Sequence, residues 1–216
     1  MMMKKVNDKK RVEEINKRAN HLLFEGDFYD SYFPKVDCAD DSFGSYLKFI
    51  FKHQRQTVDI SKTLKGITLE DTVNNIHWFL YSHIQYKTVI PEFEIKSPSC
   101  AWQSRTSGSD CKTYATFASS ILLNLNIKHY LRIVKYSNGT HIYVVVPLNQ
   151  VDYKISSKSK FGSDYLIIDS TGSKNKERPF IKKYPDTFVS LKTLSRKNTT
   201  LNIFLLLSIL AICNVK

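Results

Sequence analysis

Three residues of the chain, Cys111, His141 and Asp169, are of the types that together perform nucleophilic acyl chemistry. A cysteine thiolate attacks an acyl carbon, an imidazole pairs with the thiol and then protonates the leaving group, and a carboxylate fixes the orientation of the imidazole. Each type also has an ordinary structural interpretation. A free cysteine is usually a small buried hydrophobe, a strand histidine can be a packed core or surface residue, and an aspartate before Ser170-Thr171-Gly172 can begin a turn. The hypothesis therefore depends on whether the fold brings the three side chains together.

Cys111 is predicted to lie in the first turn of a helix. It follows Gly108-Ser109-Asp110 and begins the segment CKTYATFASSILLNL, in which apolar residues recur every three or four positions. Backbone N–H groups in the first turn of a helix are unpaired, and the helix dipole is positive there, so this position favours a thiolate. We expect the sulfur at the edge of the core.

Three strands are predicted after this helix. Residues 130–136 and 141–146 are typical of a hairpin around Asn138-Gly139, and residues 165–168 form a strand that ends at Asp169. A helix of about 15 residues spans roughly 22 Å and a strand of about seven or eight residues returns roughly 25 Å. The chain therefore comes back to the level of the cysteine. His141 begins the outgoing strand there, and Asp169 ends the next one if the two strands are antiparallel neighbours.

The stretch from Trp102 to Asp169 resembles the transglutaminase-like superfamily through the segments SGSDCKTYATFASSILL, HIYVVV and YLIIDST. The resemblance covers roughly residues 68–180 and implies an α+β, papain-like core, with an antiparallel sheet packed on the helix that carries the nucleophile. It implies Cys111 as nucleophile, His141 as general base and acid, and Asp169 as the orienting acid. Within the superfamily the chain looks like the small cysteine peptidases of bacteria and their phages. It departs from the pattern at Ser109, where many relatives have glycine.

Residues just before the nucleophile are candidates for stabilising an oxyanion. The indole N–H of Trp102 or the amide of Gln103 could assist the backbone N–H of the cysteine. Alternatively, Trp102 packs on the core and Gln103 is solvated. Cys100 could be a buried thiol, or a disulfide partner of Cys111 that would silence the site.

The sequence divides into three parts. Residues 1–66 are predicted to be a helical accessory region with helices near residues 6–24 and 43–60, residues 67–190 the catalytic core, and residues 191–216 a basic and hydrophobic tail. The core is expected to begin with a helix in the segment 68–86, where Thr68 and Asp71 form a capping box. The loop 154–164 has the composition of a mobile flap near the site.

Composition limits the other possibilities. The formal charge of +12 would promote contact with polyanions, but no nucleic-acid-binding motif is present, so nucleic-acid binding is not expected. His77 and His83 do not share a helix face and no Cys-x-x-Cys pair exists, so we expect no metal and no cofactor. No cleavable signal segment is visible, which predicts a cytoplasmic protein. The apolar segment 199–216 is either a buried helix or a membrane contact, and a virion-associated location is the other possibility.

Three functions follow from these observations. The first is hydrolysis of a peptide or other amide bond through an acyl-enzyme, with a protein or peptide as substrate. The second is acyl transfer from a protein glutamine to an amine, as in a transglutaminase. The third is a non-catalytic structural protein, such as a virion component, that keeps the fold. Substrate identity and oligomeric state do not follow from the sequence.

Overall fold

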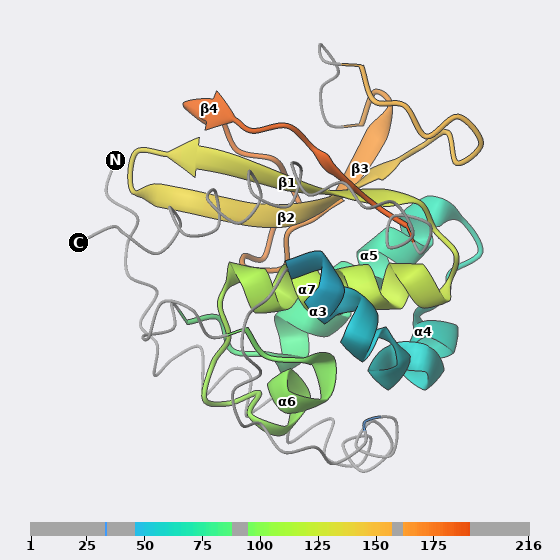
Figure 1. Cartoon of the computed structure of the whole chain (residues 1–216), viewed down its shortest axis with the longest axis vertical. Helices are drawn as coiled ribbons and strands as arrows, with labels where there is room; N and C mark the ends of the chain where they lie inside the picture. The colour runs from blue at the N-terminus through green and yellow to red at the C-terminus, as the bar shows by residue number, and fades with distance from the viewer. Residues whose placement is uncertain (1–32, 34–45, 88–94, 157–161, 191–216) are drawn as a thin grey trace.

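The computed structural model describes residues 33, 46–87, 95–156 and 162–190. In these ranges, helices and an antiparallel sheet form the α+β fold that the sequence predicts (Figure 1). The helix predicted over residues 6–24 and the tail 199–216 lie outside the described residues, as does the middle of the predicted flap, residues 157–161. None of the helices in the described ranges has the length and apolar content needed to cross a membrane.

Antiparallel pairing joins all strands of the sheet. The strands are β1 (His129–Tyr136), β2 (Gly139–Pro147), β3 (Tyr165–Ile168), β4 (Lys182–Lys183) and β5 (Thr187–Val189). Their order is β3-β2-β1-β4, and β5 also pairs with β1. The three longer strands confirm the sequence prediction. The two others are too short for residue periodicity to indicate them.

The register of the sheet sets the level of the two predicted strand residues. Val134 on β1 faces His141 on β2, and Val144 on β2 faces Ile168 on β3. Continuing the second register places Asp169 across from Tyr143, two residues from His141, as the antiparallel prediction requires. The hairpin turn lies one residue earlier than expected, at residues 137–138, because Gly139 with φ +138° already pairs with Tyr136.

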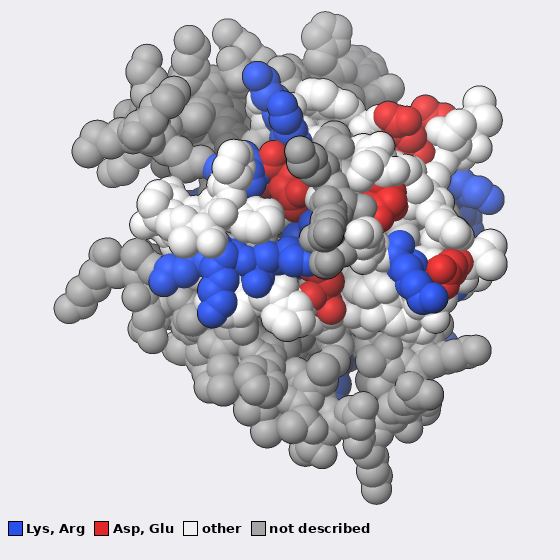
Figure 2. All heavy atoms as spheres, turned by 90° about the horizontal axis from the view of Figure 1, so that it is seen from above, with Lys and Arg blue, Asp and Glu red and all other residues white. Residues whose placement is uncertain are grey.

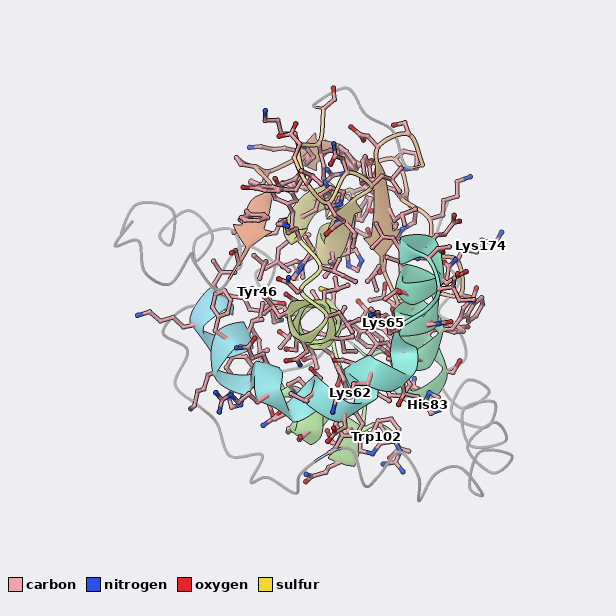
Figure 3. All side chains as sticks on the ribbon, turned by 90° about the vertical axis from the view of Figure 1, so that its right-hand side faces the viewer. Tyr46, Lys62, Lys65, His83, Trp102 and Lys174 are labelled. Atoms are coloured by element: carbon pink, nitrogen blue, oxygen red, sulfur yellow. The ribbon has the colours of Figure 1, made fainter. Side chains whose placement is uncertain are left out.

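Helix α7 (Cys111–Asn124) passes through the middle of the fold, with the sheet on one side and the other helices around it (Figure 3). The helix prediction is confirmed, but burial extends beyond the apolar face, since the first twelve residues of the helix are all buried. The buried hydroxyls have partners: Thr116 Oγ1 donates to Tyr46 Oη at 3.2 Å, and Ser119 Oγ lies 2.6 Å from His129 Nε2. Because these groups are hydrogen-bonded, neighbouring helices can cover the polar face.

The segment before the core forms three short helices rather than the one helix predicted over residues 43–60. These are α3 (Tyr46–His53), the 3₁₀ helix η1 (Gln54–Thr57) and α4 (Val58–Leu64), and they pack along α7. At the break, the carbonyl of Gln54 accepts hydrogen bonds from Thr57 Oγ1 at 2.9 Å and from Asn124 Nδ2 at 2.8 Å. These side-chain bonds compete with the regular helical pattern and tighten the chain locally.

Helix α5 (Leu69–His83) packs beside α7 at the β3 edge of the sheet. It starts at the predicted capping box, in which Thr68 Oγ1 accepts from the Asp71 N–H and the Asp71 carboxylate accepts from the Thr68 N–H, each at 3.0 Å. The helix packs against β3 and α7. It therefore fixes the strand that leads to Asp169 relative to the helix that carries Cys111.

Candidate active site

Cys111 is the first residue of α7, as predicted. The N-cap is Asp110, whose carboxylate accepts from the Thr113 N–H at 3.1 Å. The first helical hydrogen bond runs from the Tyr114 N–H to the Asp110 carbonyl, so the N–H of Cys111 lies before it. Cys111 is a free cysteine, and 5% of the residue is exposed. Its sulfur and backbone N–H both belong to the end of the helix where negative charge is stabilised.

His141 and Asp169 form a buried hydrogen-bonded pair. His141 Nε2 lies 3.0 Å from Asp169 Oδ2, and the two residues are 6% and 8% exposed. The Cys111 side chain also acts on the imidazole, since it raises the pKa of His141. Because Nε2 faces the carboxylate, Nδ1 is the nitrogen left for the sulfur. The structure thus brings the three predicted residues together in the order cysteine, histidine, aspartate.

The electrostatics of this group favour a charged imidazole. Burial by itself would lower the pKa of His141, but the Asp169 carboxylate and the Cys111 side chain raise it to about 10. Burial likewise works to raise the pKa of Asp169, yet His141 and the hydrogen bonds from Thr171 lower it to about 2. An imidazolium held between a carboxylate and a sulfur is the arrangement in which a thiolate is stabilised.

A model of the transglutaminase-like domain family matches residues 55–171, which is more than half of the chain and includes Cys111, His141 and Asp169. The chain belongs to this family. No curated protein and no solved structure matches it. The family match confirms the resemblance expected from the sequence and places the chain among thiol enzymes of the Cys-His-Asp type, without specifying the reaction.

Two further residues position the aspartate in this transglutaminase-like core. Thr171 donates from its backbone N–H, at 3.3 Å, and from Oγ1, at 2.7 Å, to Asp169 Oδ1. Asn175 accepts from the Asp169 N–H at 3.1 Å and donates to the Ile167 carbonyl at 2.7 Å. The turn suggested by Ser170-Thr171-Gly172 could have indicated Thr171. No local pattern indicates Asn175, because its role depends on how the loop returns to β3.

His77 on α5 borders Asp169. His77 is 1% exposed, and neither of its ring nitrogens is hydrogen-bonded to another described residue. Burial lowers the pKa of His77, and the Asp169 carboxylate with the backbone of Ser173 and Asp169 offsets part of that effect. A neutral His77 therefore borders the Asp169 turn without adding a second positive charge to it.

The first turn of α7 holds a buried ion pair. Lys112 Nζ contacts Asp110 Oδ2, and both side chains are 5% exposed. Tyr46 Oη donates to the Lys112 carbonyl at 2.6 Å. Because Asp110 also caps the helix, one carboxylate fixes both the path of the chain before Cys111 and the lysine that follows it.

Trp102 and Gln103 lie on α6 (Pro98–Gln103). Trp102 is buried and stacks on Phe33, with centroids 4.8 Å apart, and on Phe79, at 5.6 Å. Figure 3 shows Trp102 on the side of α7 away from the sheet, and hence away from the strand of His141. Gln103 is exposed. The oxyanion role of these two residues stays a prediction. The backbone N–H of Cys111 lies in the first turn of α7, before the first hydrogen bond of the helix.

Cys100 is disulfide-bonded, whereas Cys111 is free, so Cys100 does not pair with Cys111. Both alternatives considered from the sequence, a buried thiol and a bond that silences the site, are therefore corrected. A disulfide is more typical of an oxidising compartment than of the cytoplasm. The cytoplasmic location stays a prediction.

Metal binding finds no support in the described ranges. They contain no group of three or more histidine, cysteine, aspartate or glutamate side chains placed to hold a metal ion. His77 and His83, the pair considered from the sequence, differ in their surroundings: His77 borders Asp169, while His83 Nδ1 donates to the Phe79 carbonyl at 2.8 Å.

Proposed function

We propose that the chain hydrolyses a peptide or other amide bond through an acyl-enzyme on Cys111. The observation that supports this proposal is the buried imidazole of His141, which is hydrogen-bonded to Asp169 through Nε2 and whose pKa is raised by both Asp169 and the Cys111 side chain. Thiol hydrolysis needs a nucleophile, a proton carrier in contact with it, and a group that orients the carrier. We assign these roles to Cys111, His141 and Asp169, which are all buried.

Acylation begins when the Cys111 thiolate attacks the carbonyl carbon of the amide. The sulfur-carbon bond forms, and the π electrons of the carbonyl move onto its oxygen. The N–H of Cys111, at the positive end of α7, is placed to donate to that oxyanion. The imidazolium of His141 then transfers its proton to the amide nitrogen, the carbon-nitrogen bond breaks, and the amine leaves.

Deacylation uses the same imidazole in the opposite direction. Neutral His141 removes a proton from water, the hydroxide attacks the thioester carbon, and the carbon-sulfur bond breaks. The products are a carboxylic acid and the starting thiolate-imidazolium pair. Throughout the cycle, Asp169 keeps Nε2 engaged and so directs Nδ1 at the reacting groups.

A substrate-library digest tests the proposal. The full chain and its Cys111→Ala variant are incubated with denatured protein, and new peptide termini are identified by mass spectrometry. Loss of the nucleophile should reduce cleavage by about a thousandfold or more, since nucleophile knockouts leave only binding and oxyanion contributions. Ser120→Ala is a matched control on the same helix, because it removes a hydroxyl that donates to the Thr116 carbonyl within α7.

The same digest distinguishes hydrolysis from transfer. A labelled primary amine is included, and its incorporation into substrate glutamines is compared with the number of new termini. Hydrolysis predicts new termini with no incorporated amine. Equal cleavage by the Cys111→Ala variant, or amine incorporation without cleavage, would contradict the proposed hydrolase.

A further inference from the structure

Two lysines face each other across the sheet at the end that carries the site. Lys135 on β1 and Lys182 on β4 are direct cross-strand partners, and both are exposed. Like charges placed opposite each other on a sheet are destabilising. Among the described residues neither lysine has an ion-pair partner; Lys182 Nζ lies 4.9 Å from the centre of the Tyr184 ring, which does not neutralise it. The fold therefore maintains a concentration of positive charge here.

This pair lies close to the imidazole of the site. Lys135 also pairs with Thr140, the residue before His141, while the next cross-strand row contains Lys183, Val134 and His141. With strands about 4.8 Å apart and a rise of about 3.4 Å per residue, the Cα of Lys135 is roughly 6 Å from that of His141, and the Cα of Lys182 roughly 10 Å. Because side chains alternate along a strand, Lys135 and Lys182 point to the face opposite that of His141. On that face Ile133 packs in the same apolar cluster as Cys111, so the two lysines can reach a substrate that extends from Cys111 along that side of the sheet.

An arginine adds a third positive charge at the same end. The guanidinium of Arg178 lies 4.6 Å from the centre of the Tyr136 ring, and that ring lies 6.1 Å from the ring of His141. Figure 2 shows lysine and arginine side chains gathered in a row on the face seen from the sheet side. We call Lys135, Lys182 and Arg178 the basic rim.

Within the described part of the chain, the carboxylates named below are engaged in internal ion pairs near the basic rim. Asp169 pairs with His141, Asp110 with Lys112, and Glu177 with Arg132. Asp186 pairs with both Arg132, at 2.6 Å, and Lys183, at 3.3 Å. Their negative charge is compensated locally, so an approaching ligand meets the positive charge of the rim.

We propose that the site takes its acyl group from acidic peptide segments, in which aspartate or glutamate side chains flank the amide that is cut. This inference rests on the proposed hydrolase function and adds its substrate class. The basic rim attracts the flanking carboxylates, while Cys111 and His141 act on the amide between them. Because the two lysines of the rim are exposed, the attraction is expected to weaken with ionic strength.

Alkylation of Cys111 by two small reagents tests the charge preference without a known substrate. Iodoacetate and iodoacetamide have the same leaving group and similar size, but only iodoacetate is negatively charged. Both attack the same sulfur, so a general change in thiol reactivity cancels in the ratio of their rates. At low ionic strength, the double variant Lys135→Glu with Lys182→Glu should reduce the iodoacetate to iodoacetamide ratio by about five- to tenfold, because four units of charge change at roughly 10 Å.

Two further variants make this result specific. Lys62→Glu with Lys65→Glu makes the same charge change on α4 and at its C-cap, outside the sheet (Figure 3), and should leave the ratio within about twofold of the unmodified chain. Lys135→Gln with Lys182→Gln changes half the charge and should give an intermediate ratio. An unchanged ratio in both rim variants, or an equal change in the α4 variant, would overturn the inference. Slow reaction of Cys111 with neutral iodoacetamide would instead contradict the hydrolase function itself.

Protection of Cys111 from iodoacetamide identifies the class of polyanion. A glutamate-rich peptide should slow alkylation of the unmodified chain more than a lysine-rich peptide of equal length, and the effect should be lost in the Lys135→Glu, Lys182→Glu variant. If a uridine oligonucleotide of equal charge protects more strongly than the glutamate-rich peptide, the acidic peptide is the wrong partner. Equal protection by the acidic and basic peptides would also overturn the inference.

Discussion

Among single residues, the charge on His141 depends most directly on Asp169. Replacing the carboxylate in Asp169→Asn removes its charge, the strongest influence that raises the pKa of His141 to about 10. The pKa of His141 is then expected to fall by about two units or more, because burial remains and favours the neutral ring. The imidazolium should therefore be lost at a lower pH than in the unmodified chain.

The NMR titration of the His141 ring measures this shift directly. Asp164→Asn provides a control at the other end of β3, because the Asp164 carboxylate accepts from the Ser156 N–H and not from the imidazole. A His141 titration that is the same in Asp169→Asn and in the unmodified chain would show that the carboxylate does not control the ring.

Sequence reasoning located the residues whose chemistry is visible in their type and spacing. Cys111 was found because it follows Gly108-Ser109-Asp110 and begins an amphipathic segment, and His141 because it follows a hairpin turn. The cap that Asp110 provides for the helix is visible only in the structure. Thr171 and Asn175 were not found as supports of Asp169. Their hydrogen bonds depend on the path of a loop that no local pattern predicts.

Among the elements, α7 and β1 meet at a buried histidine that makes stability depend on pH. His129 is fully buried, its Nδ1 donates to the Ile127 carbonyl at 2.8 Å, and Ser119 donates to its Nε2. Burial lowers the pKa of His129 to about 4. Because the unfolded chain takes up the proton near the ordinary pKa of about 6.5, this residue destabilises the folded state as the pH falls from 6.5 towards 4.

Urea unfolding at two pH values measures that contribution. Between pH 7 and pH 5, the His129 term should reduce the free energy of unfolding by about 2 kcal/mol. His129→Leu removes the titrating group, so the decrease between the two pH values should be smaller by about that amount, whatever its effect at pH 7. The same decrease in both proteins would mean that His129 does not titrate as its burial implies.

The long helices and strands were predicted from the sequence, whereas the short strands were not. Helices α5 and α7 and strands β1 to β3 have enough residues for periodicity, caps or turn signals to indicate them. Strands β4 and β5 were missed because they are formed only by pairing with β1. The break at η1 was missed because it depends on Asn124, which is distant in the sequence.

At the scale of the whole molecule, a buried ion network joins β1 to the chain that follows Asp169. The Arg132 side chain is 3% exposed and donates to Glu177 at 2.9 Å and to Asp186 at 2.9 and 2.6 Å. Tyr143 and Tyr165 also donate to Glu177. Glu177 and Asp186 both lie beyond the end of the family match at residue 171. The folded unit therefore includes a segment that the family pattern does not cover.

Removing one carboxylate from this network should destabilise the fold. Glu177→Ala leaves Arg132 with one partner and two tyrosine hydroxyls without an acceptor, so the free energy of unfolding should fall by about 3 kcal/mol or more. Denaturant unfolding measures the change. Asp152→Ala, which removes an exposed carboxylate paired only with Lys154, should change stability by less than about 1 kcal/mol. Equal effects of the two substitutions would contradict a structural role for the network.

The rate at which iodoacetamide alkylates Cys111 at neutral pH, followed by mass spectrometry of the peptide that contains it, tests most directly whether the fold assembles a working thiol site. The imidazolium of His141 should keep the sulfur reactive, so His141→Ala should slow the reaction by at least about tenfold. His141→Gln fills more of the space beside Asp169 than alanine does but cannot carry the positive charge. It should slow the reaction by a similar factor, which would assign the loss to the missing charge and not to a packing defect. If Cys111 reacts as fast in both variants as in the unmodified chain, the histidine does not activate the cysteine and the proposed mechanism is wrong.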